Sequence, residues 1–351
     1  MKIAIRTDAN GQIATGHLFR CLAIASHLTE EGAEVVFVFA EPEVLSSYPA
    51  VTKYPCRVLN SDWRRPDSEI QSLIRLLREE QTDLLLVDTY FASSFYLAVL
   101  HKHLPVVYFD DLAKEIYDVS MLIHCIPETD YGRYLQRYRD RDIEVCCGLE
   151  YCPMRDEFRN CSRSSERPRR ILITTGGTDP LNLQYRLLDR FVRNSGLASF
   201  CFTAVSGALN VNYPRLRQLE ELYPERVTVL RNTMNMAELM KNSMLAVSAC
   251  GTTLYEMCAC GLPAVAFAIA DNQLSVGRTM HQLGLIRYCG DARCLGIEES
   301  VEKNLEEMIA DPEKLQTMGR EIQLRIDGRG TYRICHKIIG LCSSPGMTGR
   351  N

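Results

Sequence analysis

Short runs of hydrophobic residues alternate with longer amphipathic stretches along the first half of the chain. The short runs predict β-strands, and the stretches with apolar residues three or four positions apart predict helices between them. Such alternation is typical of a parallel, doubly wound α/β sheet. The expected strands are Lys2–Arg6, Val35–Phe39, Leu84–Val87, Val106–Asp110 and Met121–His124, and the expected helices are His17–Glu31, Ser68–Glu80 and Ala92–His101.

The same alternation restarts after a polar stretch with prolines, Tyr151–Arg169. We therefore predict two Rossmann-like domains with parallel sheets, residues 1–160 and 170–329, joined by a linker over 161–169. We also expect a helix over 330–342 that packs back on the first domain, followed by a tail over 343–351. Two such domains usually face each other across a cleft, because each binds ligand at the carboxyl ends of its strands. The expected strands of the second half are Arg170–Thr174, Phe200–Val205, Arg226–Leu230, Met244–Ser248 and Ala264–Ala268, with a helix expected at Leu183–Asn194.

A chain of 351 residues with 46% hydrophobic and 24% charged residues is long enough for two cored domains and too apolar to be disordered. Its formal net charge of -4 leaves no polybasic footprint, so nucleic acid and anionic membranes are poor candidates as partners. The short basic cluster Arg163–Arg170 is expected to be a solvated linker. The fifteen cysteines include no C-x-x-C pair, so most are expected to be reduced and buried, and no metal site is predicted. With no signal peptide and no window long enough to span a membrane, we expect a cytoplasmic protein; the sequence leaves its oligomeric state open.

One histidine lies where the first strand passes through a polar loop into the first helix. At the positive end of a helix dipole an imidazole is favoured in its neutral form, which suits a general base or a group that holds an oxyanion. An isolated histidine at such a turn is more often a capping or space-filling residue, so this alternative stays open here. The histidine, His17, follows Gly16 and precedes an apolar stripe made of Leu18, Cys21, Leu22, Ala25 and Leu28.

A glycine pair lies at the equivalent place in the second half, in the loop Thr175-Gly176-Gly177-Thr178-Asp179-Pro180. Glycine lets backbone N–H groups approach a ligand, and a helix N-terminus favours anionic oxygens, so this loop suits a diphosphate. A tight strand-to-helix turn explains the loop equally well. It lacks the Lys and Ser/Thr of a P-loop, which disfavours Mg-assisted transfer of a γ-phosphate.

Two later loops carry further candidate groups. The residues Gly251-Thr252-Thr253 follow a strand and present N–H and O–H donors at a helix start. One turn on, Glu256 has a carboxylate that suits the two hydroxyls of a ribose, although Thr253 to Glu256 also matches a capping box. The last expected strand is followed by Asp271-Asn272-Gln273, which suits sugar hydroxyls or phosphate, or is a plain turn.

Taken in order, these motifs resemble those of known families. The second half resembles the nucleotide-binding domain of GT-B glycosyltransferases, in particular the peptidoglycan N-acetylglucosaminyltransferase group. The ordered set, over roughly residues 1 to 340, resembles the UDP-sugar hydrolases of pseudaminic acid biosynthesis and the similar spore-coat polysaccharide proteins. The motifs that carry this resemblance are Gly16-His17, Arg20-Cys21-Leu22, Val87-Asp88-Thr89-Tyr90, Asp110-Asp111-Leu112, Arg155-Asp156-Glu157-Phe158, Gly176-Gly177-Thr178-Asp179 and Ala270-Asp271-Asn272-Gln273.

The resemblance implies a GT-B fold that binds UDP in its second domain. It also implies removal of UDP from UDP-2,4-diacetamido-2,4,6-trideoxy-β-L-altropyranose by water, with inversion and without a metal or other cofactor. In that family the histidine of the Gly-His motif is the catalytic residue, which matches His17. The other residues expected to bind substrate are Gly16, Arg20, Gly176, Gly177, Thr178, Asp179, Gly251, Thr252, Thr253, Glu256, Asp271, Asn272 and Gln273.

The chemistry assigns roles to a few residues near His17. We expect His17 to activate the water, and Tyr90 and Asp88 to hold that water or the acetamido groups. We expect Asp8 to bind the sugar or to orient His17; both aspartates are explained equally well as loop caps.

Two other functions fit the same sequence. A glycosyltransferase of the spore-coat type would use a similar donor with an acceptor in place of water, although no exposed apolar or basic patch for a membrane-linked acceptor is evident. A non-catalytic sensor of nucleotide sugars would bind the donor without turning it over, and the presence of His17 with both loops argues against it. We therefore predict a UDP-sugar hydrolase.

Overall fold

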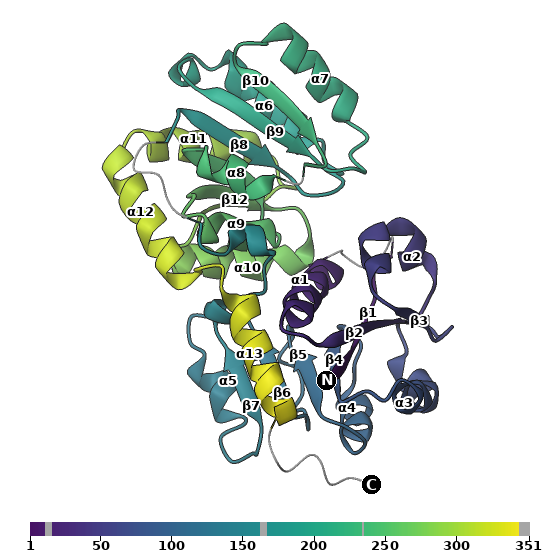
Figure 1. Cartoon of the computed structure of the whole chain (residues 1–351). Helices are drawn as coiled ribbons and strands as arrows, with labels where there is room; N and C mark the ends of the chain where they lie inside the picture. The colour runs from purple at the N-terminus through teal and green to yellow at the C-terminus, as the bar shows by residue number, and fades with distance from the viewer. Residues whose placement is uncertain (11–15, 162–166, 234, 344–351) are drawn as a thin grey trace. The chain divides into compact units, whose positions relative to one another are not determined.

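The chain divides into two compact units in the computed structural model, which describes residues 1–10, 16–161, 167–233 and 235–343. Unit 1 comprises Met1–Asp156 with Arg329–Asn351, and unit 2 comprises Glu157–Gly328 (Figure 1). The first boundary precedes the expected linker at 161–169. The chain therefore returns to unit 1 for its last helix, α13 (Gly330–Ser343).

Unit 1 is built on a parallel sheet with the strand order β3-β2-β1-β4-β5-β6-β7. Every neighbouring pair is parallel, which confirms the predicted doubly wound sheet. Strands β3 and β7 have no counterpart in the prediction, because each is short and only partly buried. The strands are β1 (Lys2–Thr7), β2 (Glu34–Phe39), β3 (Cys56–Val58), β4 (Leu84–Asp88), β5 (Val106–Phe109), β6 (Met121–His124) and β7 (Glu144–Cys147).

Helices cover both faces of this sheet. Helix α1 packs on β1 and β2. Its predicted apolar stripe is buried apart from Leu22, which is partly exposed, and the buried face includes Ile24, which was not predicted. The opposite face packs against α3, α4 and α5 in one core cluster. The helices are α1 (Gly16–Glu30), α2 (Glu43–Ser47), α3 (Ile70–Glu79), α4 (Ser94–His101) and α5 (Gly132–Gln136), with short 3-10 turns η1 (Pro49–Lys53), η2 (Pro66–Glu69) and η3 (Leu149–Tyr151).

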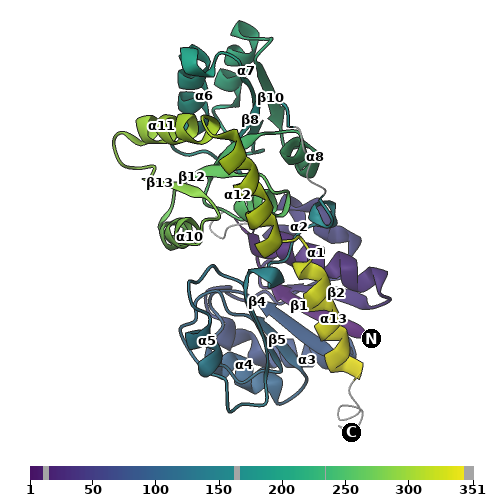
Figure 2. The same ribbon diagram turned by 90° about the vertical axis from the view of Figure 1, so that its left-hand side faces the viewer.

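Unit 2 repeats the plan with the parallel strand order β10-β9-β8-β11-β12-β13. One core cluster joins the sheet to α6, α7 and α11, and α9 packs against α12. Helix α10 lies against β12 and β13 (Figure 2). The strands are β8 (Arg170–Thr174), β9 (Cys201–Ser206), β10 (Val227–Arg231), β11 (Leu245–Ala249), β12 (Ala264–Ala268) and β13 (Arg287–Asp291). The helices are α6 (Leu183–Arg193), α7 (Tyr213–Leu222), α8 (Met236–Lys241), α9 (Thr253–Ala259), α10 (Asp271–Gln282), α11 (Ile297–Ile309) and α12 (Pro312–Arg325), and the 3-10 turns are η4 (Asp156–Phe158), at the unit boundary, and η5 (Ser195–Leu197).

The basic stretch before β8 is not simply solvated, which corrects the sequence-based expectation. Positions 163–166 lie outside the described residues. The Arg167 guanidinium donates hydrogen bonds to the carbonyls of Ser243 (2.9 Å) and Cys260 (2.6 Å), which follow α8 and α9. Cations favourably meet the unpaired carbonyls at helix C-termini. Arg167 is thus part of the packing of unit 2.

The cysteines are free thiols, and most of them are buried, as predicted. Among the described residues, no helix is both long and apolar enough to cross a membrane.

Helix α13 is fixed to unit 1 at its first turn. The Thr331 hydroxyl donates to the carbonyl of Met154 (2.7 Å) and accepts from its N–H (2.9 Å), and the helix packs against α1 (Figure 1). A Cβ atom on Gly330 would overlap the backbone of Cys152, at 2.5 Å from its carbonyl carbon and 2.7 Å from its nitrogen. By contrast, a Cβ on Gly340 of the same helix meets nothing within 4 Å.

We expect Gly330→Ala to lower the melting temperature by several degrees, because backbone on both sides must shift to admit the methyl group, at a cost of about 1–3 kcal/mol. Gly340→Ala is the matched control; it should leave the melting temperature unchanged or raise it, because alanine favours helix by up to about 1 kcal/mol. Equal melting temperatures for the two variants would contradict this account of how α13 is held.

Candidate functional site

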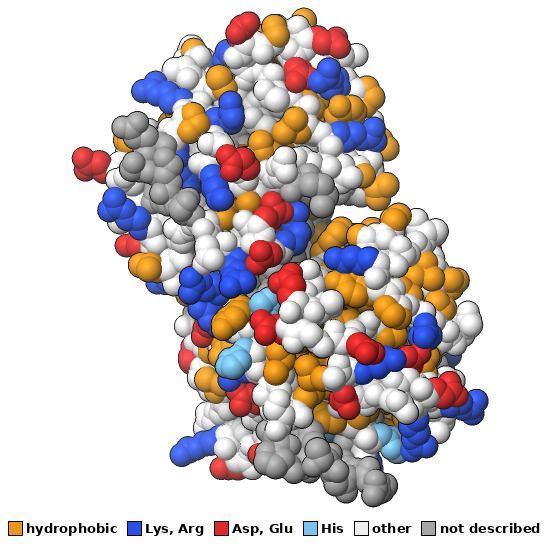
Figure 3. All heavy atoms as spheres, viewed as in Figure 1, with side chains coloured by type: hydrophobic (Ala, Val, Ile, Leu, Met, Phe, Trp, Pro, Cys, Tyr) orange, Lys and Arg blue, Asp and Glu red, His pale blue; other side chains and the backbone are white. Residues whose placement is uncertain are grey.

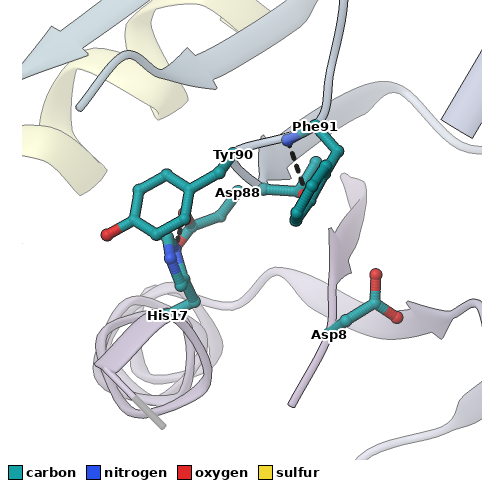
Figure 4. Close-up of a pocket in the computed structure, with 6 residues that line it drawn as sticks. Asp8, His17, Asp88, Tyr90 and Phe91 are labelled. Atoms are coloured by element: carbon teal, nitrogen blue, oxygen red, sulfur yellow. Dashed lines mark hydrogen bonds and ion pairs between the residues drawn. The ribbon is translucent and has the colours of Figure 1, made fainter. Parts of the chain in front are cut away.

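The candidate site of unit 1 lies where β1 and β4 are neighbours. There the strand order reverses, and such switch points are where open α/β sheets bind ligands, beyond the carboxyl ends of the strands. His17 is the second residue of α1, and Asp88 is the last residue of β4. The pocket is lined by Asp8, His17, Asp88, Thr89, Tyr90 and Phe91 (Figure 4). Its volume of about 10 Å³ is close to the room that one water molecule needs.

The imidazole of His17 is oriented by a buried carboxylate. Its Nδ1 lies 2.5 Å from Oδ1 of Asp88, and the side chains of both residues are almost inaccessible to solvent. Because an ionised carboxylate only accepts, the hydrogen of this bond is assigned to Nδ1. That leaves the lone pair on Nε2 as the basic position of the ring.

Asp88 is ionised although it has no access to water. Burial alone would raise the pKa of this carboxyl, but the Arg20 guanidinium, with His17, holds the pKa far below its ordinary value. The Cys21 thiol also donates to Oδ2 at 3.3 Å. Protein groups therefore occupy both oxygens of the Asp88 carboxylate. This corrects the sequence-based expectation that Asp88 holds the water or the acetamido groups.

Arg20 contacts two carboxylates of the protein, although the sequence predicted that it would contact the substrate. Its guanidinium bonds both oxygens of Asp88 and both oxygens of Asp111, the second residue after β5. The same group lies 4.2 Å above the centre of the Phe109 ring. The sequence-based prediction of site residues included neither Asp111 nor Phe109. The acidic pair Asp110-Asp111, directly after a strand, was the sequence feature that could have indicated Asp111.

Asp8 belongs to a second buried ion cluster and does not orient His17. Its Oδ1 accepts from the N–H of Ala40 (2.8 Å), and its Oδ2 accepts from Arg6 (2.5 Å). Arg6 also pairs with Glu69, and burial raises the pKa of the Asp8 carboxyl. In Figure 4 the Asp8 carboxylate points away from His17, across the pocket. Oδ1 thus holds the loop after β1 to the residue that follows β2, while Oδ2 pairs with a residue of β1 itself.

Tyr90 lies beside the imidazole and remains a neutral phenol. The rings of His17 and Tyr90 are 4.3 Å apart between centroids and meet edge to face at 81° (Figure 4). Burial, together with the Asp111 charge, raises the pKa of Tyr90 to about 12. Its hydroxyl can therefore donate or accept a hydrogen bond near neutral pH, but it is not a general base there.

His17, Asp88 and Asp111 are the one group of potential metal ligands that the described residues bring together. Both carboxylates already hold the Arg20 guanidinium at 2.5–3.1 Å. A metal ion would have to displace that cation, so the donor set fits arginine better than a metal.

In unit 2 the glycine loop lies at the equivalent switch point, between β8 and β11. Gly176 (φ 88°), Gly177 and Thr178 are exposed, and a Cβ on either glycine would point into open space. Gly207 packs so closely against the loop that a Cβ atom on Gly207 would overlap the backbone of Gly177. The loop thus leaves room for a ligand to reach its backbone directly.

Asp179 caps the helix after this loop. Its carboxylate accepts from the N–H groups of Leu183 (2.9 Å) and Gln184 (3.0 Å) and is buried. The Gln184 side chain in turn donates to the carbonyls of Ile173 and Val205. Asp179 therefore shapes the loop, while the exposed residues before it are the ones available to a ligand.

The remaining candidates surround the ends of β11 and β12. Thr252 is exposed and is the N-cap of α9, without a side-chain cap bond; the predicted capping box would need Thr253 at that position. Gly251, Thr253 and Glu256 are partly exposed nearby.

The third loop combines exposed and internal residues. Asp271 and Asn272 are exposed at the start of α10, and Asp271 pairs with Arg293 at 2.7 Å. Gln273 accepts from the N–H of Ile269 (3.0 Å), which favours the plain-turn explanation for this residue.

No protein-family model matches the chain. It is 25% identical over 247 residues to the UDP-2,4-diacetamido-2,4,6-trideoxy-β-L-altropyranose hydrolase of Campylobacter jejuni, covering 69% of this chain and 82% of that protein. It is 23% identical over 347 residues to the spore coat polysaccharide biosynthesis protein SpsG of Bacillus subtilis, covering 95% and 96% of the two chains.

Solved structures agree on the fold. The Acinetobacter baumannii MurG structure superposes with a TM-score of 0.69 at 15% identity, covering 97% of this chain and 100% of that one. The calicheamicin glycosyltransferase CalG4 does so with a TM-score of 0.65 at 13% identity, covering 98% and 99%. The chain therefore has the GT-B fold, and in sequence it resembles the UDP-sugar hydrolases of pseudaminic acid biosynthesis and the SpsG-type spore coat polysaccharide proteins.

Proposed function

We propose that this protein is an enzyme that hydrolyses a UDP-linked 2,4-diacetamido-2,4,6-trideoxy sugar to the free sugar and UDP. The observation that carries the proposal is the His17–Asp88 pair, which presents a basic Nε2 at the switch point of unit 1. The similarity to the C. jejuni hydrolase supplies the substrate class.

In the proposed reaction, a water oxygen attacks the anomeric carbon of the sugar. Nε2 of His17 accepts a proton from that water, and Asp88 stabilises the imidazolium that forms. The bond between the anomeric carbon and the β-phosphate oxygen breaks, and UDP leaves with the electron pair. Attack on the side opposite the leaving group inverts the configuration.

The leaving group is the task we assign to unit 2. Backbone N–H groups of the exposed loop at Gly176 and Gly177 suit the charge that develops on the diphosphate, and Thr252 offers a further donor. Glu256 remains our candidate for the ribose hydroxyls. These groups stabilise the leaving group without a metal ion, so we propose that none is required.

A glycosyltransferase is the second candidate, and one observation favours it. Tyr90 and Phe91, which line the pocket, and Phe19, two residues after His17, are between 41% and 46% exposed. The sequence alone did not reveal this exposed aromatic surface. Figure 3 also shows hydrophobic side chains gathered on unit 1 around α2. Such aromatic side chains suit an acceptor as well as a sugar. The two functions differ in whether UDP is released when no acceptor is present.

We expect purified protein to release UDP from UDP-2,4-diacetamido-2,4,6-trideoxy-β-L-altropyranose with EDTA present and no acceptor added. His17→Ala should lower kcat by about two to four orders of magnitude, because the general base is lost. UDP release can be followed with a coupled assay, and UDP binding by calorimetry shows that the variant is folded. Unchanged turnover in His17→Ala would refute the proposed base, and binding without any turnover would favour the transferase.

We expect Gly177→Ala to weaken UDP binding about tenfold while leaving the melting temperature unchanged. A Cβ at this position meets no protein atom within 4 Å, so a loss of affinity would report the close approach of a ligand to the loop. Gly340→Ala, whose Cβ is equally unobstructed, is the control and should bind UDP normally. Normal UDP affinity in Gly177→Ala would show that the diphosphate lies elsewhere.

A further inference from the structure

Arg20 binds two carboxylates, one at the end of β4 and one in the loop after β5. Its Nε and Nη2 donate to the two oxygens of Asp88 at 2.6 and 2.5 Å. Its Nη1 and Nη2 donate to the two oxygens of Asp111 at 3.1 and 2.7 Å. Two bidentate pairs on one guanidinium use its planar fork on both sides, which lysine cannot reproduce.

The same guanidinium also lies next to the catalytic imidazole. Nη2 is 3.1 Å from Nδ1 of His17. Because Nδ1–H points to Asp88, this contact acts through charge: a cation at this distance opposes further protonation of the ring.

We infer that Arg20, clamped by Asp111, is a positioning residue that fixes the tautomer of His17 and keeps its Nε2 free, and that it is not a ligand of the substrate. The inference rests on the proposed function, in which Nε2 accepts the proton. Each guanidinium nitrogen already has a carboxylate partner, and the side chain is 14% exposed. These bonds use four of the five N–H groups of the guanidinium, and among the described residues only the second N–H of Nη1 has no carboxylate partner. A phosphate or sugar oxygen pair could therefore form a bidentate contact with Arg20 only by displacing a carboxylate.

Removing Arg20 has a predictable electrostatic sign. Among the described residues, the other charged or titratable groups around the imidazole come from three strand ends and from α1. They are Asp88 at the end of β4, Tyr90 two residues later, Asp111 after β5, Asp8 across the pocket and the Cys21 thiol of α1, which donates to Asp88. Without the guanidinium the carboxylates dominate, so imidazolium is favoured and less free base remains at a given pH. The acidic limb of the kcat/KM profile should move to higher pH.

The test compares Arg20→Lys, Arg20→Ala and Asp111→Asn with the control Arg57→Lys. Arg57, on the edge strand β3, pairs with Glu80 and is also an arginine of unit 1. With UDP-2,4-diacetamido-2,4,6-trideoxy-β-L-altropyranose as the probe, we expect kcat to fall 10- to 100-fold in Arg20→Lys and about tenfold in Asp111→Asn, with KM within threefold of the parent. Arg57→Lys should match the parent. A large rise in KM with unchanged kcat in Arg20→Lys would overturn the inference and make Arg20 a substrate ligand.

Arg20→Ala adds two readouts that a purely structural role would not move. Its acidic limb should lie at higher pH than that of the parent, whereas Arg20→Lys, which keeps the charge, should shift it less. Millimolar guanidinium should restore part of the lost kcat by occupying the vacated space. No shift and no rescue in a folded variant would contradict the clamp.

A readout without turnover separates failure of the clamp from failure of the proposed function. The protein is labelled with ¹⁵N-histidine, and the His17→Gln variant identifies the NMR signals of His17. At pH 8 these signals should be those of the Nδ1–H tautomer. The Arg20→Ala variant should show a larger share of imidazolium. If the parent shows this tautomer but hydrolyses nothing, the proposed function fails and the clamp stands. If the parent is active but shows the Nε2–H tautomer, the clamp fails. If Arg20→Ala does not fold, Arg20→Lys and Asp111→Asn are compared by the same spectroscopic measurement. An unchanged tautomer in both variants, together with unchanged kcat, would overturn the inference about Arg20.

Discussion

A carboxylate that is buried without water, Asp88, is the constraint around which unit 1 is arranged. A buried charge is tolerated only when it is paired and hydrogen-bonded, and loss of one partner of such a pair typically costs about 3–5 kcal/mol. Here the partners are His17 and Arg20, from the first two turns of α1. The ionic contact therefore binds the end of β4 to the start of α1, and the orientation of the imidazole follows from it.

The two units use the same sheet topology for different chemistry. In both, the strand order reverses between the first and fourth strands, so that two loops diverge and leave space at the carboxyl edge of the sheet. Unit 1 fills the edge of that space with charged side chains, which can orient a base. Unit 2 presents exposed glycine backbone there, at Gly176 and Gly177. A base needs orientation by a fixed partner, whereas a diphosphate needs converging N–H donors that side chains would obstruct.

Several polar residues in the candidate loops hold the loops themselves. Asp179 caps α6, Gln273 closes the turn before α10, and Asp8 fastens the loop after β1 to Ala40 and Arg6. In chemical terms, an aspartate or glutamine side chain in such a loop can bind a ligand or accept from a backbone N–H equally well. Their partners decide which, and those partners are residues on other elements or amides that only the folded loop presents.

The sequence by itself determined most of the alternation of strands and helices, although not β3, β7 and β13, and with it the two Rossmann-like halves. It also placed His17 at the start of the first helix and the glycine pair in the loop after the first strand of the second half. These features depend on local periodicity and on loop composition, which neighbouring residues specify. Tertiary structure alone decided that Asp88 and not Asp8 orients His17, and that Arg20 grips Asp111 above Phe109. Asp111 is 91 positions from Arg20, and the two meet only because β1, β4 and β5 lie side by side and end at one edge of the sheet. A contact of that range is set by strand order, which no local pattern of residues encodes.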